Sequence, residues 1–153
     1  MNLFGVMEVS GSALKAERIR AEIVAANMAN AETTRTAEGG PYRRQHVVFQ
    51  SADSSQSFSE QMSMAGITPG VNDAQTVNGG VRVSAVVQDQ SSPLKRYDPH
   101  HPDADKDGYV SYPDINPLTE MVDLMGATRA YDLNNSAVQA TKSMLTASLD
   151  ILK

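Results

Sequence analysis

Small and apolar residues recur every three or four positions through residues 1–35. Ala16, Ile19, Ile23 and Ala26 follow this spacing, which places them on one side of a helix with 3.6 residues per turn. Glycine and serine interrupt the residues before Ala13, and both residue types weaken a helix interior. The pattern predicts a helical segment over about 3–33 whose first turns are weak, so that the helix starts properly only near residue 12.

Residues 117–153 carry a stronger pattern, with steps of three and four residues throughout. Such steps are typical of helices that pair as a coiled coil. Three polar residues interrupt the apolar line, and a polar residue inside such a line lowers stability while it selects register and partner. The predicted line consists of Met121, Leu124, Thr128, Tyr131, Asn135, Val138, Lys142, Leu145, Leu149 and Leu152.

The middle of the chain, residues 36–116, holds most of the prolines, and proline breaks helices and central strands. Strands are predicted at 42–49 and 81–86, with a hairpin turn signal at 77–81, and 91–102 is predicted to be irregular. The serine-rich stretch 51–65 is predicted to be a loop. The fold class is therefore α+β: long N- and C-terminal helices, 1–35 and 117–153, paired as one domain, with a small β-rich middle element.

Composition and charge exclude several classes of protein. The chain has no cysteine, which excludes disulfides, thiolate metal sites and cysteine nucleophiles. A net charge of −5 argues against binding to nucleic acid. The sequence contains no run of 18 apolar residues and no basic segment followed by an apolar one at its start. We therefore expect neither direct membrane insertion nor a cleaved signal peptide.

One loop has the spacing of a calcium site. Asp103, Asp105, Asp107, Gly108 and Asp114 occupy positions 1, 3, 5, 6 and 12 of such a loop. The last position is usually a longer glutamate, and prolines flank this loop where helices would be expected. A tight turn stabilised by short acidic side chains is the favoured interpretation. A calcium-binding module remains an alternative.

The sequence shows no set of residues that would form an active site. His100 and His101 lie in a proline-rich stretch that is typical of a solvated loop. Nucleophile and phosphate-binding motifs are absent from the sequence. We predict no enzymatic activity, no cofactor and no metal.

Two asparagines lie on one side of the first predicted helix. Asn27 and Asn30 are three residues apart, with Ala26 beside them. Short neighbours would let another backbone approach, so that the amides bond across the contact. A solvent-facing polar patch near the end of the helix is an equally good interpretation.

Several blocks of sequence together carry a resemblance to a known family. The block 24–35 (VAANMANAETTR) resembles the N-terminal signature of bacterial flagellar rod and hook proteins, and the short chain fits a proximal rod subunit. The other blocks are GGPYRR (39–44), DKDGYVSYP (105–113), EMVDL (120–124), RAYD (129–132) and KSML (142–145).

The resemblance implies a structural subunit of the periplasmic basal-body rod, exported uncleaved by the flagellar type III apparatus. Its terminal helices would polymerise into the axial drive shaft that transmits torque and forms the export channel. Its partners would be itself, other rod subunits, and adjacent basal-body and export-apparatus proteins. A helical adaptor that binds one partner is a second alternative. The predicted assembly interface is Ala26, Asn27, Asn30, Met121, Leu124, Tyr131, Val138, Leu145 and Leu149.

Overall fold

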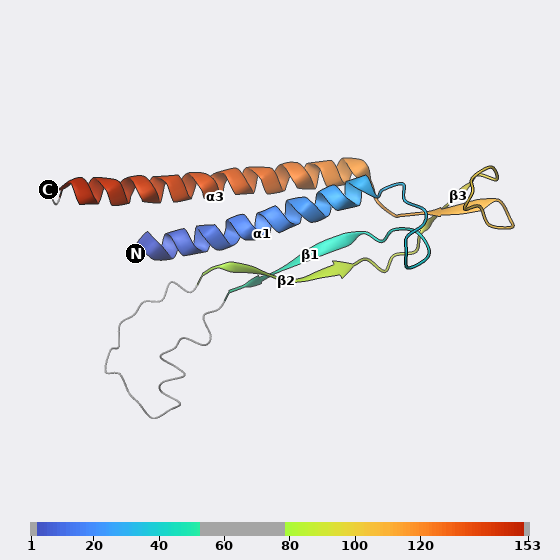
Figure 1. Cartoon of the computed structure of the whole chain (residues 1–153), viewed down its shortest axis with the longest axis horizontal. Coiled ribbons are helices and arrows are strands. Elements are labelled where there is room, and N and C mark those ends of the chain that lie inside the picture. The colour runs from blue at the N-terminus through green and yellow to red at the C-terminus, as the bar shows by residue number, and fades with distance from the viewer. Residues whose placement is uncertain (1–2, 53–78, 152–153) are drawn as a thin grey trace, which may run out of the picture.

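Two long helices form the body of the molecule, in a computed structural model that describes residues 3–52 and 79–151. Helix α1 (Leu3–Ala29) and helix α3 (Pro117–Ile151) run antiparallel and side by side (Figure 1). α3 continues past the N-terminal end of α1 (Figure 1). The predicted α+β class, with paired terminal helices around a small β-containing middle, is confirmed.

Helix α1 begins at Leu3, so the predicted start near residue 12 is wrong. Tertiary contacts override the weak local propensity, because most helical stability in proteins comes from packing. Ser10 is buried, and the Ser12 hydroxyl donates to Val9 O at 2.7 Å. The same hydroxyl accepts from the N–H of Val81 at 3.1 Å. The serines that argued against a helix therefore join α1 to the rest of the chain.

Helix α3 has a well-formed start. Asn116 caps it, with its Oδ1 accepting from the N–H of Leu118 at 3.0 Å. Pro117 is the first helical residue, where its missing N–H costs nothing and its fixed φ suits a helix. This cap fixes the rotational position at which α3 meets α1.

The side of α3 that faces α1 differs from the predicted line at every second position. Leu124, Val138 and Leu145 lie in the contact, half-buried as predicted. At four other positions the predicted residue is exposed and the contact uses the preceding residue. Ala127 and Thr141 are shorter than the residues they replace, which lets the two helices approach closely. The replacing residues are Glu120, Ala127, Asn134 and Thr141, in place of Met121, Thr128, Asn135 and Lys142.

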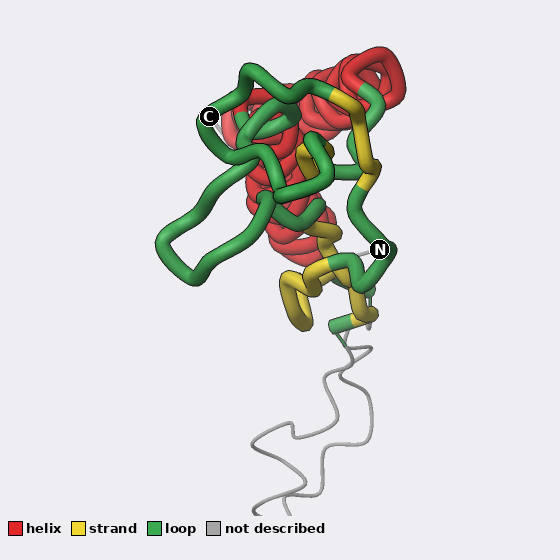
Figure 2. Tube along the Cα trace, turned by 90° about the vertical axis from the view of Figure 1, so that its right-hand side faces the viewer, coloured by secondary structure: helices red, strands yellow, loops and turns green. Residues whose placement is uncertain are grey.

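The described residues of the middle region form two separate two-stranded antiparallel sheets. Strand β1 (Gln45–Ser51) pairs with β2 (Val81–Gln88), and the register shifts at Val48/Phe49. Strand β3 (Leu94–Tyr97) pairs with β4 (Tyr109–Tyr112). The β1–β2 pair lies along α1, and the loops of the middle region gather at the opposite end of the molecule from the C-terminus (Figures 1 and 2).

The strand predictions are correct in place and imprecise in extent. The strands predicted at 42–49 and 81–86 correspond to β1 and β2. The irregular prediction for 91–102 is wrong at β3, because the partner that orders β3 is β4, twelve residues further on and invisible to local pattern. Most of the predicted loop 51–65, and the first two residues of the turn signal at 77–81, lie outside the described residues.

The buried apolar core is small and made mostly of short side chains. Within the described residues it consists of Ala16, Val24, Val110, Ile115 and Ala127. The largest fully buried side chain is Glu120, which is charged. In the part of the chain that the structure describes, neither helix has a stretch long and apolar enough to cross a membrane.

Candidate functional site

Asn27 lies at the point where both helices and β1 meet, and is 1% exposed. Its Nδ2 donates to Gln45 O at 2.9 Å and to Glu120 Oε2 at 3.0 Å. Its Oδ1 accepts from the N–H of Gln45 at 2.9 Å and from the Tyr42 hydroxyl at 3.1 Å. Every donor and acceptor of the amide is therefore used. The amide bonds the edge of β1 as another peptide group would.

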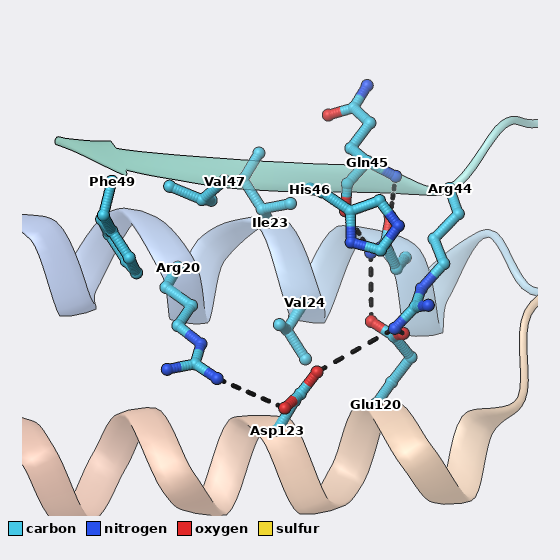
Figure 3. Close-up of a pocket in the computed structure, with 11 residues that line it drawn as sticks. Arg20, Ile23, Val24, Arg44, Gln45, His46, Val47, Phe49, Glu120 and Asp123 are labelled. Carbon is cyan, nitrogen blue, oxygen red and sulfur yellow. Dashed lines mark hydrogen bonds and ion pairs between the residues drawn. The ribbon is translucent and has the colours of Figure 1, made fainter. Parts of the chain in front are cut away.

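Glu120 carries the charge at this meeting point and is also 1% exposed. Its Oε1 forms an ion pair with the Arg44 guanidinium. Arg44 lies 3.9 Å from Asp123, which is also paired with Arg20 of α1 at 3.3 Å (Figure 3). We refer to Asn27, Tyr42, Arg44, Gln45 and Glu120 as the Asn27 cluster.

The Asn27 cluster joins three parts of the chain that are distant in sequence: the end of α1, the entry to β1 and the start of α3. A buried charge is tolerated only when it is paired and hydrogen-bonded. Burial and the nearby Glu120 carboxylate both raise the pKa of the Tyr42 phenol, which stays neutral and able to donate. The cluster therefore fixes how the middle region sits on the helix pair.

A cavity of about 300 Å³ opens between β1 and the two helices beside this cluster. Ile23, Val24, Val47 and Phe49 form its apolar wall (Figure 3). Its arginines are paired with its carboxylates, and His46, which also lines it, lies 3.7 Å from Asp89. With its charges paired in this way, the cavity is suited to packing and positioning.

The acidic loop that has the spacing of a calcium site forms a turn. Gly108 has φ +77° and donates to Asp105 O at 2.9 Å, and the strand β4 follows. The Asp103 carboxylate accepts from the Thr34 hydroxyl at 2.8 Å and lies 3.6 Å from Arg35. Within 3–52 and 79–151, no three His, Asp or Glu side chains come close enough to hold a metal ion. Asp103 thus attaches the β3–β4 loop to the segment after α1.

Calcium is accordingly expected to leave the melting temperature of the protein unchanged at 1–5 mM. A ligand that binds the folded state alone at a hundredfold excess over its dissociation constant would add about 2.7 kcal/mol to stability. Thermal unfolding followed by circular dichroism, with magnesium as control, measures this. A rise of several degrees specific to calcium would restore the calcium-module alternative.

The residues predicted for assembly are distributed over several surfaces. Asn27 is in the cluster, Ala26 is half-buried, and Asn30 Nδ2 donates to Ala26 O at the end of α1. Leu124, Val138 and Leu145 lie between the helices, whereas the last three are exposed on α3: Met121, Tyr131 and Leu149. Their role in contacts between subunits stays a prediction.

A second apolar side of α3 was not recognised in the sequence. Leu118, Val122, Leu133 and Met144 are all more than half exposed. Their steps of 4, 11 and 11 residues keep them on one side, since eleven residues make about three turns. They form a row of exposed apolar side chains along a side of α3 that α1 does not cover.

Comparison with known proteins agrees with this two-helix arrangement. The family model "Flagella basal body rod protein" matches residues 7–35, and "Flagellar basal body rod FlgEFG protein C-terminal" matches residues 106–151. The two matches therefore cover most of α1, the end of the β3–β4 loop, β4 and α3.

Full-length relatives decide the family. "Flagellar basal-body rod protein FlgC" of Bacillus subtilis is 42% identical, with all of both chains covered. The protein of the same name from Borreliella burgdorferi is 38% identical over 100% of this chain and 99% of its own, and that of Salmonella typhimurium is 33% identical over 99% and 98%. The chain belongs to the FlgC family of flagellar basal-body rod proteins.

Membership in the FlgC family makes this a structural protein of the flagellar basal body and not an enzyme, as the sequence predicted. Four of the five members of the Asn27 cluster lie in the sequence blocks that carried the resemblance: Asn27 in VAANMANAETTR, Tyr42 and Arg44 in GGPYRR, and Glu120 in EMVDL. Arg44 and Glu120 form the ion pair of this cluster. Sequence reasoning missed their role, although an acid one residue from an apolar heptad position and an arginine pair near a strand were available signals.

Proposed function

We propose that this FlgC-family chain is a proximal rod subunit that polymerises through its terminal helices into the axial drive shaft. The shaft transmits torque and surrounds the export channel. The observation that carries the proposal is that α3 has apolar side chains on two sides, of which α1 covers one. A helix that is apolar on more than one side is typically enclosed by neighbours. A polymer supplies those neighbours.

The unequal lengths of the helices support the same proposal. α1 has 27 residues and α3 has 35, so at 1.5 Å per residue they span about 40 and 52 Å. α3 continues past the N-terminal end of α1 (Figure 1), and Leu149, two residues before the end of α3, is 63% exposed. An adjacent subunit along the axis would cover this end.

The proposed partners are other copies of this chain, other rod subunits, and neighbouring basal-body and export-apparatus proteins. We propose a periplasmic location in the rod and export without cleavage. In this proposal 1–35 and 117–153 form one tube domain, and 36–116 is a separate outer element. The assembly contacts are Ala26, Asn27, Asn30, Met121, Leu124, Tyr131, Val138, Leu145 and Leu149.

Complementation of a strain that lacks this subunit tests the proposal. Leu145→Ala is expected to lower monomer stability by about 2 kcal/mol, because the side chain is half-buried against α1. Leu149→Glu is expected to leave monomer stability unchanged, because the side chain is 63% exposed in the monomer. Both variants are expected to abolish swimming and to stop rod construction after export.

Gln139→Glu serves as the matched control, since it adds a charge to an exposed position of α3 outside the proposed contacts. It is expected to support normal swimming. Mass measurement of the subunit in purified rods reports whether its N-terminus is intact. Normal rods built from both Leu145→Ala and Leu149→Glu would contradict assembly through the terminal helices.

A further inference from the structure

Gly126 lies in the interior of α3, where glycine is one of the least favourable residues. A Cβ built at Gly126 would meet no heavy atom within 4 Å beyond the helix's own backbone, and its φ is not positive. Gly108 differs, because its φ is +77° and a Cβ there would lie 2.9 Å from the Tyr97 ring. The single chain thus requires glycine at 108 and gives no reason for glycine at 126.

The position of Gly126 relates it to the second apolar side of α3. It follows Val122 by four residues and precedes Leu133 by seven, so the three lie on one side of the helix. Val122 is 58% and Leu133 is 72% exposed. Bare backbone between two large exposed side chains forms a notch that another helix can approach closely.

The charges beside this notch indicate which surface approaches it. Arg129 and Asp132 are exposed, and neither forms an ion pair within 3–52 and 79–151. The outward side of α1 is complementary, because it presents charges of both signs. Its exposed residues recur in steps of three and four: Glu8, Gly11, Lys15, Arg18, Glu22, Ala25 and Ala29.

Lys15 and Glu8 also form no ion pair within the described residues. Short residues lie on both sides of the charges in this row, with Gly11 before Lys15 and Ala25 after Glu22, so large side chains of α3 can pack there. The two surfaces belong to different helices of one chain. Their contact is therefore heterologous and repeats from copy to copy, as a filament requires.

We propose that the outward side of α1 from a second copy of this chain packs against α3 at Gly126, with Lys15 of that copy facing Asp132. The proposal rests on the proposed function and names the partner of the exposed side of α3. It assigns to Gly126 a role in assembly that opposes its effect on the single subunit.

Gly126→Ala separates the two effects. In the purified monomer the added methyl group has open space and favours helix, so the melting temperature is expected to rise by about 4 °C. Self-association, measured by sedimentation equilibrium, is expected to weaken by about tenfold or more, because the methyl group holds the second helix away. Rod yield in the complemented strain is expected to fall with it. Gly126→Leu is expected to abolish both self-association and rod formation.

Asn135→Ala is the control. Asn135 is exposed and lies nine residues from Gly126, on the opposite side of α3. Alanine is also the better helix former there, so the melting temperature should rise while association stays unchanged. Asp132→Lys should weaken association, and adding Lys15→Asp should restore it.

Unchanged self-association of Gly126→Ala and Gly126→Leu would overturn the proposed contact at Gly126 and leave the proposed function unaffected. A fall in the melting temperature of Gly126→Ala would also overturn it, because the glycine would then be required within the chain. Failure of Lys15→Asp to rescue Asp132→Lys would exclude α1 of a second copy as the occupant. Loss of rods with no self-association of the unmodified chain would assign the surface to a different rod subunit. Normal rods from Leu149→Glu together with Leu145→Ala would instead count against the proposed function.

Discussion

Arg44→Ala is expected to destabilise the folded monomer by about 3–5 kcal/mol, which is a large part of the stability of a domain of this size. Glu120 is 1% exposed, and Arg44 is its ion-pair partner. Removing Arg44 leaves a buried carboxylate that keeps one hydrogen bond, from Asn27. Urea unfolding followed by far-ultraviolet circular dichroism measures the loss.

Arg43→Ala is the matched control, because Arg43 is adjacent and exposed and forms no ion pair within the described residues. It is expected to change stability by less than about 0.5 kcal/mol. Arg44→Leu combined with Glu120→Leu removes both charges and should be more stable than Arg44→Ala alone. Equal stabilities for Arg44→Ala and Arg43→Ala would show that the pair does not hold the middle region on the helices.

Asn27→Leu is expected to cost about 3–5 kcal/mol, because it leaves four polar groups without their partner. These are the N–H and C=O of Gln45, the Tyr42 hydroxyl and one oxygen of Glu120. Each buried group left unsatisfied costs about 1–3 kcal/mol, and some relax towards water in the adjacent cavity. Hydrogen exchange should show lost protection at the N–H of Gln45 in particular.

Asn30→Leu provides the comparison three residues later on the same helix. Asn30 is half-buried, and its side chain bonds Ala26 O and Thr33, so its loss is expected to cost about 1 kcal/mol. Asn27→Leu and Asn30→Leu with the same urea midpoint would refute a special role for Asn27. A lower midpoint for Asn27→Leu, with rods lost, is the expected result.

The two asparagines illustrate what a sequence pattern leaves open. Their spacing placed them on one side of a helix, where a contact with another backbone and exposure to solvent were equally good interpretations. In the structure Asn27 is enclosed and Asn30 remains local to the end of α1. The difference arises because the entry to β1 passes over Asn27, and that path depends on residues far along the chain.

The heptad line in α3 shows a similar limit. A pattern of threes and fours identifies a pairing helix but locates its contact side only to within about one residue, or 100°. Leu124, Val138 and Leu145 lie where they were expected, Tyr131 lies at the edge of the contact, and Met121 is exposed. The choice of Glu120 over Met121 follows from Arg44 and Asn27, which offer a partner to a carboxylate and none to a thioether.

The sequence by itself determined the two terminal helices, the β-containing middle, the turn at Gly108 and, through its combined blocks, the flagellar rod family. Helical and strand periodicity, turn residues and short sequence motifs are properties of neighbouring residues, so they can be read along the chain. The tertiary structure alone decided the early start of α1, the pairing of β3 with β4 and the enclosure of Glu120 by Asn27 and Arg44. Each of these depends on a contact between residues distant in sequence, and burial of a charge is favourable only once such a contact has formed.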